Sequence, residues 1–130
     1  MKHSFIKKER LTGRSLISTL FADGHTFYLF PFRVTWMSHP SDGSAPVQVV
    51  MSVPKYNFPK STCRNLIRRR IKESYRLNKN ILCETLLTGH QQILVCIHYT
   101  AKEILAFELI QGKIILLLQR LKEENEKVTG

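Results

Sequence analysis

Basic residues are concentrated between positions 64 and 76, where six of the thirteen side chains carry a positive charge. At about 100° per residue, a helix places Ile67 and Ile71 on one side and a row of cations on the other. The row consists of Arg64, Arg68, Lys72 and Arg76, with Asn65 and Arg69 beside it. Such a row suits the phosphate backbone of a nucleic acid, because each neutralised phosphate releases condensed counterions. The solvated face of an ordinary helix has the same pattern, but the amide of Asn65 both donates and accepts hydrogen bonds, which favours nucleic acid.

Side chains that could break a bond are scarce elsewhere in the chain. A two-metal nuclease needs several carboxylates at one point, but the only aspartates, Asp23 and Asp42, both precede glycine in turn-like contexts. The five histidines show no ligand spacing, and there is no glycine-rich phosphate loop. The three cysteines are odd in number and widely spaced, so neither a disulfide framework nor a zinc site is indicated. We therefore predict no catalytic or metal-binding residue and expect the chemistry to come from a partner.

The composition limits the class of protein. A length of 130 residues with 43% hydrophobic residues predicts a single globular domain over residues 1–130. A formal net charge of +10 points to nucleic acid or an anionic membrane surface. The basic start is followed by no apolar stretch of signal-peptide length, and the longest apolar run, Ile114 to Leu118, is too short to cross a bilayer. We expect a cytoplasmic protein that does not bind membranes.

Hydrophobic spacing and turn residues predict the elements that position the basic row. Helical spacing indicates helices over Glu9–Phe21, from Ser61 or Thr62 as N-cap to about Asn78 or beyond, and over Glu103–Glu126. Asn80 and Gly89 are the candidate stops of the middle helix. Alternating or continuous apolar residues indicate strands over Phe27–Met37, Val47–Val53 and Gln92–Tyr99. Pro31 predicts an edge or a break that divides the first strand into two pieces. We expect the strands over Phe27–Met37 and Val47–Val53 to form an antiparallel hairpin, and the whole chain to be an α+β sandwich.

Several motifs together resemble the protein subunit of bacterial ribonuclease P. The similarity rests on Arg64-Asn65-x-Ile67-Arg68-Arg69 and the residues that follow as far as Tyr75-Arg76. It extends upstream to Ser52-Val53-x-Lys55, to Lys8-x-Arg10-Leu11, and to the Leu20-Phe21-x-x-Gly24 that ends the first helix. Two features depart from the family pattern. The family helix usually opens Arg-Asn-Arg, and Leu66 takes the third place here. The segment 56–60 before the basic helix is about one residue longer and lacks the usual glycine.

The resemblance implies a fold and a division of labour. The implied fold is a four-stranded sheet with three helices, in the order α-β-β-β-α-β-α, with a left-handed crossover around the basic helix. The implied function is the endonucleolytic maturation of the 5′ end of transfer RNA. Ribonuclease P RNA is the catalyst and binds Mg²⁺, the protein binds none, and one protein monomer pairs with one RNA. The partners are that RNA and precursor tRNA.

The resemblance also implies roles for individual residues. Those expected to contact the catalytic RNA are Lys55, Lys60, Arg64, Asn65, Arg68, Arg69, Lys72 and Arg76. Those expected to hold the single-stranded 5′ leader of the substrate, in a cleft between the first helix and the sheet, are Ile17, Phe21, Phe32, Val34 and Trp36. Core packing is the other explanation for the aromatic residues in this set. A basic structural RNA-binding protein of the ribosomal type is the alternative function, since related folds occur there.

Overall fold

A computed structural model describes residues 9–40, 45–83 and 91–129. The helices are α1 (Arg14–Asp23), α2 (Ser61–Asn78), the short α3 (Asn80–Cys83) and α4 (Phe107–Thr129). The strands are β1 (His25–Leu29), β2 (Phe32–Pro40), β3 (Val47–Ser52) and β4 (Gln91–Tyr99). The α+β class, the four-stranded sheet and the division of the first strand around Pro31 are thereby confirmed.

The four strands lie in the order β1-β2-β4-β3, so the last strand in the sequence occupies an interior position in the sheet. β4 is antiparallel to β2 and parallel to β3. The predicted hairpin between β2 and β3 is therefore wrong, and the hairpin is formed by β1 and β2. The continuous apolar run of β4 explains the difference, because a strand covered on both faces is favoured inside a sheet.

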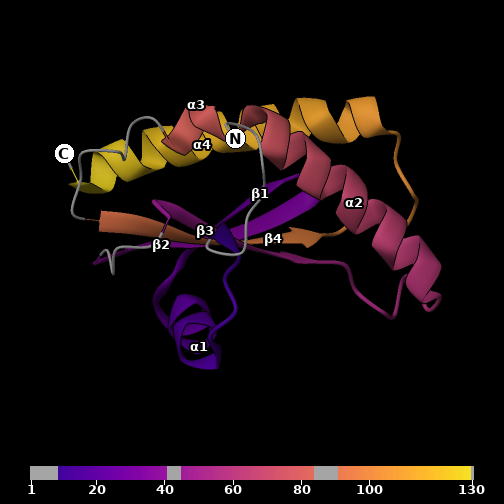
Figure 1. The fold of residues 1–130 in the computed structure, drawn as a ribbon, viewed down its shortest axis with the longest axis horizontal. Helices are drawn as coiled ribbons and strands as arrows, with labels where there is room; N and C mark the ends of the chain where they lie inside the picture. Colours follow the sequence, from indigo (N-terminus) through magenta and orange to yellow (C-terminus); the bar gives the residue numbers. More distant parts are fainter. Residues whose placement is uncertain (1–8, 41–44, 84–90, 130) are drawn as a thin grey trace.

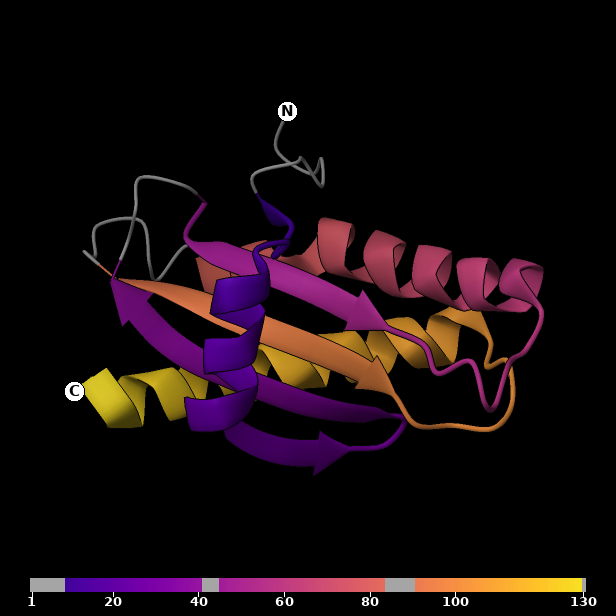
Figure 2. The ribbon, with the colours of Figure 1, turned by 90° about the horizontal axis from the view of Figure 1, so that it is seen from below.

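The connection from β3 through α2 to β4 is left-handed, as the resemblance implies and against the common rule for such crossovers. Figure 2 looks onto the sheet from the side of α1, with β3 and β4 running in the same direction and α2 behind them. The crossover leaves α2 over the β3 edge of the sheet, on the opposite side from α1 (Figure 1).

The main hydrophobic core lies between the sheet and the layer formed by α2 and α4. Alternate residues of the strands point into it, with Phe32, Val34, Trp36, Val49, Ile93, Val95, Ile97 and Tyr99 among them, all with side chains at most 2% exposed. They pack against Ile67, Ile71, Ile110, Ile114, Leu117, Leu118 and Leu121 of the two helices. The prediction that one face of α2 docks on a core through Ile67 and Ile71 is confirmed.

α1 lies across the other face of the sheet (Figure 2), where a smaller core holds it. Leu20 of α1 is fully buried with Leu94 and Cys96 of β4. Gly24 ends α1 and donates its backbone N–H to the carbonyl of Leu20. A Cβ at position 24 would lie 2.4 Å from that carbonyl oxygen, so the tight corner between α1 and β1 requires glycine.

Three helix starts differ from their predicted positions. α1 begins at Arg14 rather than Glu9, because Arg10 and Leu11 are extended and form a bridge to Val49 of β3. Ser61 is the first residue of α2 rather than its cap, since Lys60 is the N-cap and no side chain caps it. α4 begins at Phe107 rather than Glu103, because the preceding chain is held by Tyr99. The Tyr99 hydroxyl donates to the carbonyl of Glu103 at 2.6 Å and accepts from the N–H of Leu105 at 3.1 Å. The candidate helix stop at Gly89 lies outside the described residues.

Candidate nucleic-acid interface

The middle of α2 and the connection that precedes this helix present cations to solvent. Arg69 and Lys72 are exposed on α2, and Lys55 and Lys60 are exposed on the connection from β3. Asn65 is exposed beside them. The helix is held in this orientation by its buried apolar side, so the charges point outward as a consequence of the same spacing. Of the predicted row and its two neighbours, Lys72, Asn65 and Arg69 face solvent as expected.

The remaining members of the row make contacts within the protein. Arg64 Nη1 donates to the backbone carbonyls of Phe58 and Pro59 at 2.8 and 2.9 Å, so it ties the connection to the first turn of α2. Arg76 is paired with Glu73 one turn earlier, which lowers the pKa of Glu73 through a hydrogen bond. Both arginines are half-buried and therefore offer RNA less of their charge than the exposed members do.

Arg68 is intermediate between the exposed members of the row and those that are paired within the protein. It is half-buried, donates to Asn65 Oδ1 at 3.1 Å and turns toward the edge of β3. Arg70 is different, because its Nη1 donates to the backbone carbonyl of Leu105 at 2.6 Å. Arg70 thus joins α2 to the segment that leads into α4, and its charged side chain stabilises the fold.

The side of the sheet that carries α1 offers a second surface. One row across the strands consists of Tyr28, Arg33, His98 and Ser52, which are neighbours in register on β1, β2, β4 and β3. This row lies next to the one containing Thr35 and Cys96, which is buried. Tyr28 is 70% exposed, and Arg33, His98 and Ser52 are half-buried. A phenol ring beside a guanidinium on an open sheet face is a combination that suits single-stranded nucleic acid.

His98 is the titratable group of this row. Its Nδ1 lies 3.1 Å from Ser52 Oγ, and its register partner on β2 is Arg33. Partial burial, with a smaller contribution from the Arg33 charge, lowers the pKa of His98 below its ordinary value. The imidazole is therefore neutral at neutral pH and adds hydrogen-bonding capacity rather than charge.

The predicted leader-binding residues separate into two groups. Ile17 is half-buried and Phe21 is 55% exposed on α1, so both are on the side where the open row lies. Phe32, Val34 and Trp36 are at most 1% exposed and belong to the core under α2 and α4. Their predicted contact with a leader is therefore wrong, because the side chains point into the opposite layer.

The residues that sequence reasoning missed are Tyr28, Arg33 and His98. Alternation along β2 carried the necessary signal, because side chains on either side of Val34 must point to the other face. The pattern did not indicate which helices cover each face of the sheet. Trp36 shows the outcome: its indole N–H donates to Glu124 of α4 at 3.2 Å.

Other kinds of site find little support in the described ranges. No helix among the described residues is long and apolar enough to span a membrane. The part of the chain that the structure describes contains no group of three or more histidine, cysteine, aspartate or glutamate side chains placed to hold a metal ion.

Comparison with known proteins identifies the family. A family model described as Ribonuclease P matches residues 5–122. The ribonuclease P protein component of Chlorobium phaeobacteroides is 30% identical over 93% of this chain and 86% of its own length. That of Porphyromonas gingivalis is 36% identical over 62% of this chain. This chain spans only 58% of the length of the Porphyromonas relative.

Solved structures confirm the fold. The ribonuclease P protein of Thermotoga maritima superposes with a TM-score of 0.68 at 22% identity, covering 86% of this chain and 96% of its own. That of Staphylococcus aureus gives 0.65 at 20% identity, covering 88% and 95%. The comparisons give no support to the ribosomal-type alternative. Since the family model covers most of the sequence, the chain belongs to the ribonuclease P protein family.

Proposed function

We propose that this chain is the protein subunit of ribonuclease P and supports 5′ maturation of tRNA by binding a catalytic RNA and the leader of its substrate. The observation that carries the proposal is the exposed basic surface of α2 and its connection, in a chain of this family. The exposed members Lys55, Lys60, Arg69 and Lys72 contact phosphates of the catalytic RNA. Asn65 adds hydrogen bonds to sugars or bases.

Leader binding is assigned to the α1 side of the sheet. Phe21 and Tyr28 are exposed aromatic rings on this side, and each can stack on an unpaired base. Arg33, the register partner of Tyr28 on β2, supplies a positive charge beside that ring. This assignment replaces the buried Phe32, Val34 and Trp36 and keeps Ile17 and Phe21.

The chemistry of bond cleavage is assigned to the RNA. Mg²⁺ bound by the RNA supplies charge neutralisation and activation of water when present. The protein side chains bind and orient the two RNAs, and none of them transfers a proton in this proposal. We also propose that one protein monomer binds one RNA and that the complex works in the cytoplasm.

Reconstitution tests the proposal. The chain is mixed with a bacterial ribonuclease P RNA, and cleavage of precursor tRNA at the 5′ end is followed at low Mg²⁺ and physiological salt. We expect the mixture to cleave and each component alone to cleave slowly or not at all. Cleavage by the protein after all RNA is removed would contradict the division of labour. Failure of the protein to bind the RNA would contradict the proposal as a whole.

A further inference from the structure

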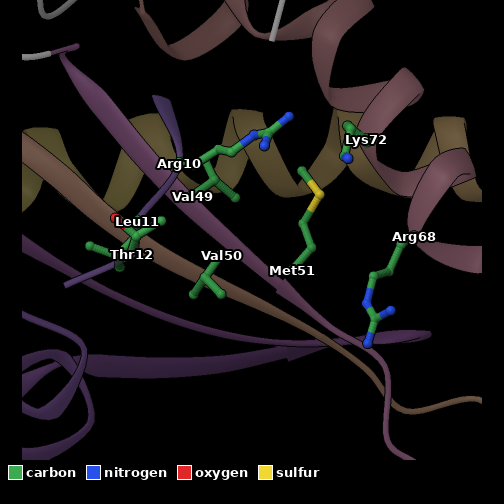
Figure 3. Close-up of a pocket in the computed structure, with 8 residues that line it drawn as sticks. All are labelled: Arg10, Leu11, Thr12, Val49, Val50, Met51, Arg68 and Lys72. Carbon is green, nitrogen blue, oxygen red and sulfur yellow. The ribbon is translucent and has the colours of Figure 1, made fainter. Parts of the chain in front are cut away.

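A pocket opens between the free edge of β3, the segment 10–12 and α2. Its volume is about 230 Å³, which is space for roughly eight water molecules at about 30 Å³ each. The lining residues are Arg10, Leu11, Thr12, Val49, Val50, Met51, Arg68 and Lys72 (Figure 3). We propose that this pocket binds one unstacked nucleotide of the RNA subunit, with its base on the apolar floor and its phosphate beside Arg10 and Lys72. The inference rests on the proposed function and names a site within it.

The floor of the pocket has the chemistry of a base-binding surface. Val50 and Met51 are half-buried and supply apolar surface, with the buried Leu11 and Val49 beneath them, and a bare phosphate would gain nothing from it. The side chain of Met51 rises between Arg10 on one side and Arg68 and Lys72 on the other (Figure 3). A thioether is polarisable and makes favourable contacts with aromatic rings, so Met51 suits the face of a base.

The rim has the chemistry of a phosphate site. Arg10, Arg68 and Lys72 come from two parts of the chain far apart in sequence and line the same pocket, with the Arg68 guanidinium turned away from Arg10 and Lys72 (Figure 3). No carboxylate is among the described residues that line it. The acidic side chain next to Arg10 in sequence, Glu9, is held by Lys79 at 2.8 Å. Similarly, Glu73 beside Lys72 is paired with Arg76.

The free edge of β3 adds hydrogen-bonding groups. β3 pairs with β4 along its other side, and a single parallel bridge joins Arg10 to Val49 on the free side. In that bridge the N–H of Leu11 donates to the carbonyl of Val49 at 3.0 Å. The bridge is isolated, so among the described residues no strand pairs with this edge at Met51. Outward backbone groups of an edge strand are ready partners for the polar rim of a base.

Position favours the catalytic RNA as the source of the nucleotide. The pocket shares Arg68 and Lys72 with the basic row of α2 that the proposed function gives to this RNA. The proposed leader surface has its exposed aromatic rings on α1 and β1, whereas this pocket lies at the β3 edge.

Two variants separate the base from the phosphate. Met51→Ser removes the apolar contact without changing the charge, and we expect about tenfold weaker binding of ribonuclease P RNA at every salt concentration. Arg10→Gln combined with Lys72→Gln should lower the log–log slope of affinity against salt by roughly one unit for each lost phosphate contact. Lys102→Gln is the control for loss of a single surface charge, because Lys102 is exposed beyond the end of β4. It should behave as the wild type.

Base-specific chemical probing of the RNA locates the ligand. One unpaired nucleotide should be protected in the wild-type complex and become reactive with Met51→Ser and with the double variant. Unchanged affinity and protection with folded Met51→Ser would overturn the nucleotide site, even if the double variant lowers the slope. If Met51→Ser does not fold, the double variant provides the test, because both of its changed residues are exposed. Protection of the nucleotide that persists in the double variant would then overturn the nucleotide site. If the loss of affinity depends on the length of the precursor leader, the bound nucleotide belongs to the substrate, and this result overturns the proposal as well. These outcomes require a wild-type protein that binds the RNA, and absence of that binding refutes the proposed function instead.

Discussion

Two glycines show how strongly the effect of an added methyl group depends on its surroundings. Gly24 lies at the corner between α1 and β1, where an added Cβ would also lie 3.0 Å from Thr35 Cγ2. Gly112 lies on α4, where nothing is within 4 Å of an added Cβ. Gly24 holds α1 against the sheet, whereas Gly112 only costs helix stability.

We therefore predict opposite signs for two alanine substitutions. Gly24→Ala should lower the free energy of unfolding by about 1–3 kcal/mol, because the methyl group overlaps the Leu20 carbonyl. Gly112→Ala should raise it by up to about 1 kcal/mol. Urea denaturation of the two variants and the wild type measures both. An unchanged midpoint for Gly24→Ala would show that the corner can relax.

The pKa of His98 makes stability depend on pH. The folded pKa is lowered relative to the unfolded chain, where it lies near about 6.5. Between the two values the unfolded state binds the extra proton, so stability falls as pH decreases from about 6.5 through the folded pKa. The contribution is fully present above pH 6.5. Thermal unfolding of wild type and His98→Gln from pH 7.5 to 5 tests this, and we expect a smaller loss in the variant.

At the scale of elements, α2 performs two tasks with neighbouring arginines. Arg69 is exposed to solvent, while Arg70 donates to the Leu105 carbonyl and joins α2 to the start of α4. The helix thus uses one arginine for its proposed ligand and the next for its own position.

The two arginines should separate binding from stability. Arg69→Ala should weaken RNA binding and lower the salt slope by roughly one unit, with the melting temperature nearly unchanged. Arg70→Ala should lower the free energy of unfolding by about 1–3 kcal/mol, because the half-buried Leu105 carbonyl loses a charged donor. Filter binding at several salt concentrations and thermal unfolding measure the two effects. Equal losses of stability in both variants would contradict the separation.

Helical periodicity explains why the outward face of α2 could be predicted. Ile67 and Ile71 fix the buried side, so the positions of Arg69 and Lys72 follow from the sequence alone. Hydrogen bonds of Arg64 and Arg70 to carbonyls outside α2 could not be predicted, because they depend on where Phe58 and Leu105 lie. Alternation in β2 identified two faces correctly, but the layers that cover them are set by contacts between segments far apart in sequence.

At the scale of the whole molecule, a buried ion pair joins the N-terminal segment to the end of α2. Lys79 Nζ lies 2.9 and 2.8 Å from the two carboxylate oxygens of Glu9, and both residues are buried. This contact keeps segment 10–12 beside β3, where Arg10 and Leu11 line the pocket. The geometry of the proposed nucleotide site therefore depends on a contact outside it.

Breaking this pair should destabilise the protein. Lys79→Met should lower the free energy of unfolding by about 3–5 kcal/mol, because it leaves the Glu9 charge buried without that partner. Adding Glu9→Gln should restore much of the loss. A double-mutant cycle from urea denaturation measures the coupling. Additive effects of the two substitutions would show that the pair contributes no coupling energy.

The interior position of β4 has a consequence during translation. β2 and β3 precede β4 in the sequence but have no direct pairing with each other, since both pair with β4. A nascent chain shorter than about residue 91 can form the β1–β2 hairpin and the α2 helix but not the described sheet that joins them. The sheet, and with it the free edge beside α2, can therefore assemble only after most of the polypeptide has left the ribosome exit tunnel.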